Sequence, residues 1–99
     1  MTEKTTFYKE QEMTFKTLMQ YVPIVAKVHG GSHPEFHEVH KLFEAIKEKA
    51  KERNIDEYYL SEEFAKMREV TKDYMVPEDV CESFEAVYKM LTALDEAYN

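Results

Sequence analysis

The sequence lacks most of the residues that break helices or build compact metal and disulfide sites. Its 99 residues include one cysteine, no tryptophan, two glycines and three prolines. The single cysteine, Cys81, excludes an internal disulfide and a cysteine-based zinc or cluster site within one chain. No apolar run reaches the roughly 18 residues of a membrane span. The first residues carry charge and have no apolar core, so they do not resemble a signal peptide. We therefore expect a cytoplasmic protein with no membrane partner.

Basic residues are also in deficit. Lysine and arginine number 13 against 20 aspartates and glutamates, which gives a formal net charge of −7. Phosphate backbones are bound by clustered lysine and arginine, so nucleic acid is not expected as a partner. Apolar residues make up 43% of the chain, too many for a disordered protein and enough for a core. The length predicts a single domain over residues 1–99.

Apolar side chains recur every three or four residues in four segments, the pattern of amphipathic helices. The segments are 6–29, 32–54, a third that ends near Tyr74, and 77–98. Four such helices with short connections bury their apolar faces most simply as an all-α, antiparallel, up-down-up-down four-helix bundle.

Local signals predict where these helices begin and end. Pro23 is expected to kink the first helix, and Gly30–Gly31 to end it in a left-handed conformation. Ser32 and Glu35 have the spacing of a capping box at the start of the second helix. Pro77 is expected to open the fourth helix. The start of the third helix stays open between caps at Asn54, Asp56 and Ser61.

All four histidines lie within twelve residues. On a helix, three of them and a glutamate share an arc of roughly 60°, beside the core face. Imidazole and carboxylate groups at this spacing can bind a divalent metal. The predicted metal ligands are His29, His33, His37, His40 and Glu44.

Other roles for these histidines are open. A histidine beside a core face is more commonly a half-buried, hydrogen-bonded residue, and a pH-responsive surface is a further alternative. His29 could instead cap the last carbonyls of the first helix. Cys81 is expected one turn inside the fourth helix as a small packing residue, although a helix N-terminus can lower the pKa of a thiol. No catalytic residue set or phosphate-binding loop is found.

Two stretches are similar to motifs of the RIC (repair of iron centres) proteins. The first is KVHGGSHPEF at residues 27–36, which resembles K-V-x-x-V-H-G-x-H-P-E-L. The second is REVTKDYMVPEDVC at residues 68–81, which resembles R-x-L-T-x-x-Y-x-x-P-x-x-A-C. The order and spacing hold from about Phe7 to Asn99, so the resemblance extends over nearly the whole chain.

The resemblance implies a hemerythrin-like bundle, a cytoplasmic setting and a link to repair of iron–sulfur proteins under oxidative or nitrosative stress. The family holds a di-iron centre. Carried onto this sequence, its ligand positions fall beside Tyr8, around residues 50–54, near Glu57 and just beyond Asn99, and no histidine stands there. The chain therefore resembles a short RIC form, or a fragment of one, without the mapped di-iron ligands.

Two function classes follow. The first is a RIC-like protein of iron–sulfur repair or stress defence that binds iron or another divalent metal through the histidines and serves iron–sulfur client proteins. The second is a metal-free helical interaction module, with contacts through the turn at residues 29–35 or the acidic surface. Haem binding is a weaker third hypothesis, because a bundle of this size has little spare volume. An enzymatic role is not expected, and a homodimer stays open.

Overall fold

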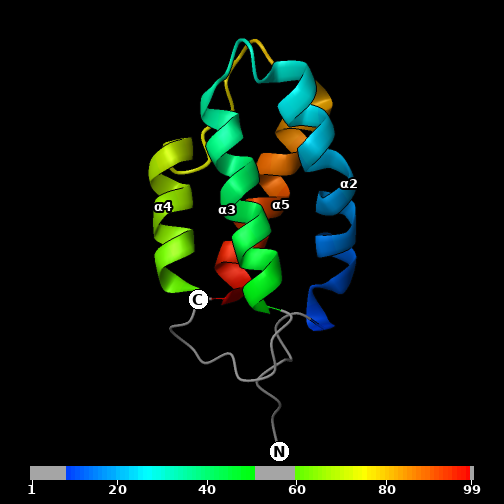
Figure 1. Ribbon diagram of the computed structural model, residues 1–99, viewed down its shortest axis with the longest axis vertical. Helices are drawn as coiled ribbons and strands as arrows, with labels where there is room; N and C mark the ends of the chain where they lie inside the picture. The colour runs from blue at the N-terminus through cyan, green and yellow to red at the C-terminus, as the bar shows by residue number, and fades with distance from the viewer. Residues whose placement is uncertain (1–8, 51–59, 99) are drawn as a thin grey trace, which may run out of the picture.

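The computed structural model describes residues 9–50 and 60–98, and these form an antiparallel four-helix bundle. The helices are α2 (Glu12–His29), α3 (Glu35–Ala50), α4 (Ser61–Thr71) and α5 (Glu82–Tyr98). Helix α3 packs mainly on α4 and α2, and α2 packs on α5. The turn between α2 and α3 and the segment between α4 and α5 lie together at one end of the bundle (Figure 1). The predicted fold class is thus confirmed.

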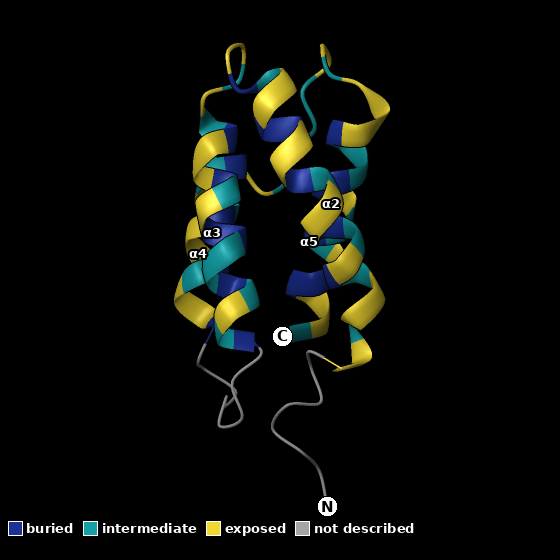
Figure 2. Ribbon diagram, turned by 45° about the vertical axis from the view of Figure 1, so that its right-hand side comes forward, coloured by how far each residue is buried: buried dark blue, intermediate teal, exposed yellow. Residues whose placement is uncertain are grey.

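One apolar core extends along the bundle, because each helix turns its apolar face inward (Figure 2). The α3 face is buried as predicted, from Phe36 through Phe43 to Ile46. On α2 the buried face is narrower than expected, since Met19 and Val28 are exposed. Only two polar side chains among the described residues are buried, those of Thr71 and Asp95. The interior is therefore almost wholly apolar.

The predicted helix boundaries need correction at the end of α2, at the start of α3, which begins at Glu35, and at the start of α5. Helix α2 continues through Pro23, and Gly30, which follows it, has φ −60° rather than a left-handed conformation. Helix α5 begins at Glu82 and not at Pro77. Helix α4 begins at Ser61, whereas the alternative caps Asn54 and Asp56 lie outside the described residues.

The left-handed backbone occurs where no glycine stands. Lys72, Asp73 and Tyr74 have φ values of 55°, 60° and 62°. Three successive non-glycine residues in this region are strained, and neighbouring bonds must hold them. The Asp73 N–H donates to the Arg68 carbonyl at 2.7 Å, and the Tyr74 N–H donates to Thr71 Oγ1 at 2.8 Å. This turn directs the chain from α4 back toward the end of the bundle where α2 meets α3.

Candidate functional site: a cysteine–histidine pair at one end of the bundle

Two contacts join the α2–α3 turn to the segment before α5. His29 Nε2 lies 3.2 Å from Cys81 Sγ, and His33 Nε2 lies 3.0 Å from Asp79 Oδ1. These residues are about fifty positions apart in sequence, and the bundle brings them together because both loops lie at the same end (Figure 1). The contact between His29 and Cys81 thus places a thiol and an imidazole at hydrogen-bond distance.

Cys81 immediately precedes α5 and is exposed, so the expected packing role inside the helix is wrong. Its carbonyl accepts the N–H of Glu85 at 3.1 Å, which places Cys81 at the helix N-cap. The backbone N–H of Phe84, the His29 side chain and the backbone N–H of Ser83 stabilise the thiolate and lower the pKa of Cys81 to about 7. A substantial fraction of the sulfur is then thiolate, the nucleophilic form, at neutral pH.

A buried phenylalanine positions both histidines of this site. The Phe84 ring is 0% exposed, and the rings of His29 and His33 each approach it edge-on with centroids 5.4 Å away. Phe84 in turn packs against Phe36 at 5.0 Å. His29 therefore does not cap the carbonyls of α2. Its ring lies between the aromatic core and the Cys81 sulfur.

His33 links the two loops through both of its ring nitrogens. Nδ1 lies 3.1 Å from Glu35 Oε2, and Nε2 contacts the Asp79 carboxylate. The side chain of His33 is only 14% exposed. In place of the predicted capping box with Ser32, Glu35 thus pairs with His33. This half-buried, hydrogen-bonded state is one of the alternatives that the sequence left open.

The other predicted ligands lie along the outside of α3 and have separate partners. His37 is exposed and lies against Gly30, where an added Cβ would be 2.4 Å from His37 Nε2. His40 Nε2 lies 3.8 Å from Glu44 Oε2, and the other oxygen of Glu44 pairs with Lys47 at 2.9 Å. The five residues predicted as ligands therefore have four separate settings, since only His40 and Glu44 lie close to each other.

The described residues contain no group of three or more His, Cys, Asp or Glu side chains positioned to hold a metal ion. Among the described residues, the bundle interior is filled with apolar side chains such as Phe15 and Phe43, which offer no ligands to the di-iron centre that the family resemblance implies. The positions near Tyr8, around 51–54 and at Glu57 lie outside the described residues. Metal binding by the histidines stays a prediction.

Sequence reasoning missed a second polar group, centred on Asp95. This carboxylate is 7% exposed and accepts two bonds from Arg68 Nη1, both 2.7 Å, and one from the Tyr74 hydroxyl, also 2.7 Å. Burial and the bond to Asp95 raise the pKa of Tyr74. The one available signal was an acidic residue beside the apolar positions of α5, with Arg68 as the opposite charge on α4.

Comparisons with known proteins add no relative: no family model, curated protein or solved structure matches this chain. No helix within the described ranges is long and apolar enough to cross a bilayer.

Proposed function

We propose that this chain is a RIC-like cytoplasmic protein that acts in iron–sulfur cluster repair or in defence against oxidative or nitrosative stress, with the Cys81–His29 pair as its reactive group. The observation that supports this proposal is the 3.2 Å contact between His29 Nε2 and Cys81 Sγ. This contact joins the two stretches that resemble the RIC motifs, residues 27–36 and 68–81.

The geometry of the pair suits reaction with a peroxide. When the thiol proton resides on His29, the thiolate of Cys81 attacks one oxygen of the peroxide and breaks the O–O bond. The sulfur is oxidised to a sulfenic acid, and the departing hydroxide takes the proton from His29 to leave as water. Exposure of Cys81 gives the oxidant access, and the N-terminus of α5 stabilises the thiolate before reaction.

The test is the pH dependence of the reaction between Cys81 and a small disulfide reagent or hydrogen peroxide. We expect a midpoint near pH 7 for the wild type. In His29→Gln the midpoint rises toward the value of a free cysteine, about 8.5, and the rate at neutral pH falls several-fold. The variant His40→Gln is the matched control, since His40 pairs with Glu44 and not with the thiol. Equal midpoints in the wild type and His29→Gln would contradict the role of the pair.

The biological part of the proposal has its own assay. Wild-type protein is expected to restore an iron–sulfur enzyme that peroxide has inactivated, and Cys81→Ser is expected not to do so. Metal content of anaerobically purified, untagged protein is measured in the same preparation. Stoichiometric iron or zinc that is lost in the double variant His37→Ala, His40→Ala would instead support the histidine-based metal site. Full repair activity in Cys81→Ser would contradict a role of the thiol in repair.

A metal-free interaction module is the second candidate, and one observation favours it. The three most exposed large apolar side chains of helix α2 are Met13 at 75%, Ile24 at 59% and Val28 at 68%. At 100° per residue these three lie on one side of the helix. Binding of iron–sulfur client proteins through this side would make the two candidates parts of one function. Loss of client binding in Ile24→Lys, with Glu10→Lys as an exposed control, would support this role.

A further inference from the structure

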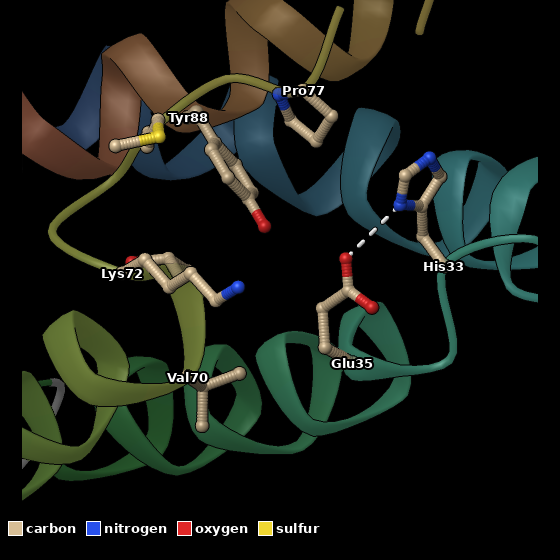
Figure 3. A pocket seen from close by; sticks show the side chains of 8 residues that line it. His33, Glu35, Val70, Lys72, Pro77 and Tyr88 are labelled. Atoms are coloured by element: carbon tan, nitrogen blue, oxygen red, sulfur yellow. Dashed lines mark hydrogen bonds and ion pairs between the residues drawn. The ribbon is translucent and has the colours of Figure 1, made fainter. Parts of the chain in front are cut away.

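A cavity of about 360 Å³ lies beside the Cys81–His29 pair and is not used by it. The α2–α3 turn, the start of α3, the end of α4, the segment between α4 and α5, and the middle of α5 line it (Figure 3). Its apolar wall includes Val70, Met75 and Pro77. Its polar side chains come from His33, Glu35, Lys72 and Tyr88. A mostly apolar pocket with a few convergent polar groups is typical of a small-molecule site, and this volume is at the small end of the usual range.

The hydroxyl of Tyr88 is one polar group that the cavity offers to a ligand. Tyr88 is 1% exposed, and its ring is fixed between Phe36, stacked at 6.3 Å, and Phe84 at 4.8 Å. Figure 3 shows the hydroxyl directed into the cavity. It has no hydrogen-bond partner among the described residues, unlike Tyr74 with Asp95. The hydroxyl is therefore a polar group at the cavity surface that can bond a ligand, while its ring is held in the core.

Opposite charges lie on two sides of this hydroxyl. Lys72 directs its ammonium group into the cavity from the end of α4, and Glu35 directs its carboxylate into it from α3 (Figure 3). Lys72 forms no ion pair with a described residue. Glu35 pairs through Oε2 with His33, which leaves its other oxygen for a ligand. A ligand that satisfies both groups carries a negative group toward Lys72 and a positive group toward Glu35, as the carboxylate and ammonium of a zwitterion do.

The position of Lys72 depends on the strained turn after α4. Lys72 has φ 55°, and the turn holds it by hydrogen bonds, including one from the Met75 N–H to the Thr71 carbonyl at 3.1 Å. This backbone brings a lysine over the cavity at the point where α4 has ended. The same segment contributes Met75 to the apolar wall.

We propose that this cavity binds a small zwitterion, namely an α-amino acid with an apolar side chain. Its carboxylate lies between Lys72 and the Tyr88 hydroxyl, its ammonium contacts Glu35, and its side chain packs against Val70 and Met75. A simple anion would face the Glu35 carboxylate, and a simple cation would face the Lys72 ammonium. The proposal does not depend on the proposed function, because neither Cys81 nor His29 lines the cavity.

Titration calorimetry of the full chain with L-leucine and L-methionine tests the proposal. We expect saturable binding in the micromolar to millimolar range, about −4 to −8 kcal/mol by conversion of the dissociation constant. Two analogues of leucine each lack one charge: 4-methylpentanoate has no ammonium, and 3-methylbutylamine has no carboxylate. Each should bind roughly tenfold or more weakly than L-leucine, because one charged group of the site is left unpaired.

Three substitutions assign the contacts. Tyr88→Phe keeps the stacked ring and removes the hydroxyl, so we expect several-fold weaker binding with an unchanged fold by circular dichroism. Lys72→Gln should weaken binding of L-leucine roughly tenfold, whereas Lys66→Gln, at an exposed position on α4, should not. Glu35→Gln should also weaken binding of L-leucine roughly tenfold, whereas Glu38→Gln, at an exposed position on α3, should not.

Several results would overturn the proposal. One is the absence of saturable binding of either amino acid at roughly 10 mM, about tenfold above the weakest expected dissociation constant. Another is equal affinity for L-leucine and 4-methylpentanoate. Full affinity in Tyr88→Phe would also reject the site. If Glu35→Gln fails to fold, the analogue series and Tyr88→Phe still decide. Cys81→Ser should bind L-leucine like the wild type, which separates this result from any failure of the proposed function.

Discussion

Two groups of polar side chains join segments that lie far apart in the sequence, and they differ in burial. Around Asp95, both carboxylate oxygens are bonded, by Arg68 and Tyr74, and the carboxylate is 7% exposed. Around Cys81, the sulfur is exposed and has an imidazole as its side-chain partner. A buried, fully bonded group stabilises the fold, because removal of one partner leaves another unsatisfied. An exposed pair with a lowered thiol pKa contributes reactivity instead.

The largest expected effect is on the buried group. Asp95→Ala removes the acceptor of Arg68 and Tyr74, and we expect the free energy of unfolding to fall by about 3 kcal/mol. Asp79→Ala removes the carboxylate that pairs with His33 at the other end, where Asp79 is 70% exposed. There the loss should be at most about 1 kcal/mol. Urea titration of both variants checks the contrast, and equal losses would contradict it.

At the end of the bundle that contains Cys81, we expect close packing of the backbone to contribute more to stability than the polar contacts there. A Cβ at Gly30 would lie 2.3 Å from the Ala26 carbonyl and 2.4 Å from His37 Nε2, whereas a Cβ at Gly31 meets nothing within 4 Å. We expect Gly30→Ala to destabilise the protein by about 2 kcal/mol. Gly31→Ala should be neutral or slightly stabilising. Thermal unfolding of the two variants is a matched measurement, and a neutral Gly30→Ala would show that the turn can move.

Alkaline pH separates the buried Tyr88 and the half-buried Tyr74 from exposed tyrosines. Burial, with a smaller effect of Glu35, raises the pKa of Tyr88 to about 12. An unfolded tyrosine ionises near pH 10, so only the unfolded state gains charge above that pH and stability falls as pH rises. Tyr88→Phe should lessen this fall, and Tyr74, whose pKa is also raised, should account for the rest. Urea unfolding midpoints of the wild type and Tyr88→Phe at about pH 9 and about pH 11 test this prediction. An equal fall of the midpoint in the two proteins would argue against burial of the Tyr88 hydroxyl.

The smallest effect on stability is expected at Cys81. Cys81→Ser should change the free energy of unfolding by at most about 0.5 kcal/mol, because the side chain is exposed. Its thiol has a lower pKa in the folded state, so the small stabilisation is present at high pH and is lost as pH falls through about 7. His29→Gln should remove part of that dependence. A loss as large as that in Asp95→Ala would mean that the pair is structural.

Much of the fold could be predicted from the sequence because it depends on short-range periodicity. The apolar stripes of α3 and α5 gave their helices and most of their buried residues, such as Phe43 and Leu91. Helix ends were less predictable. Pro77 is a favourable first helical residue, yet α5 begins at Glu82, where the Cys81 carbonyl accepts the N–H of Glu85.

The candidate site was predictable only in part, because its contacts cross the bundle. The sequence indicated the histidine-rich turn, but helical spacing grouped His33 with His37 and His40. His33 instead precedes α3 and turns toward Asp79. No local pattern indicates that His29 meets Cys81, since 52 positions separate them. The left-handed conformation of Lys72 was also hidden, because no glycine stands there and backbone hydrogen bonds within the turn hold it.

The position of the one thiol also makes the chain simple to follow by spectroscopy. A maleimide dye can attach only at Cys81, just before α5 and at the end of the bundle that contains the cavity. Because the chain has no tryptophan, one introduced at an exposed site would be the sole indole donor for that dye. Energy transfer between the two would report any opening of that end, free of background from other labels.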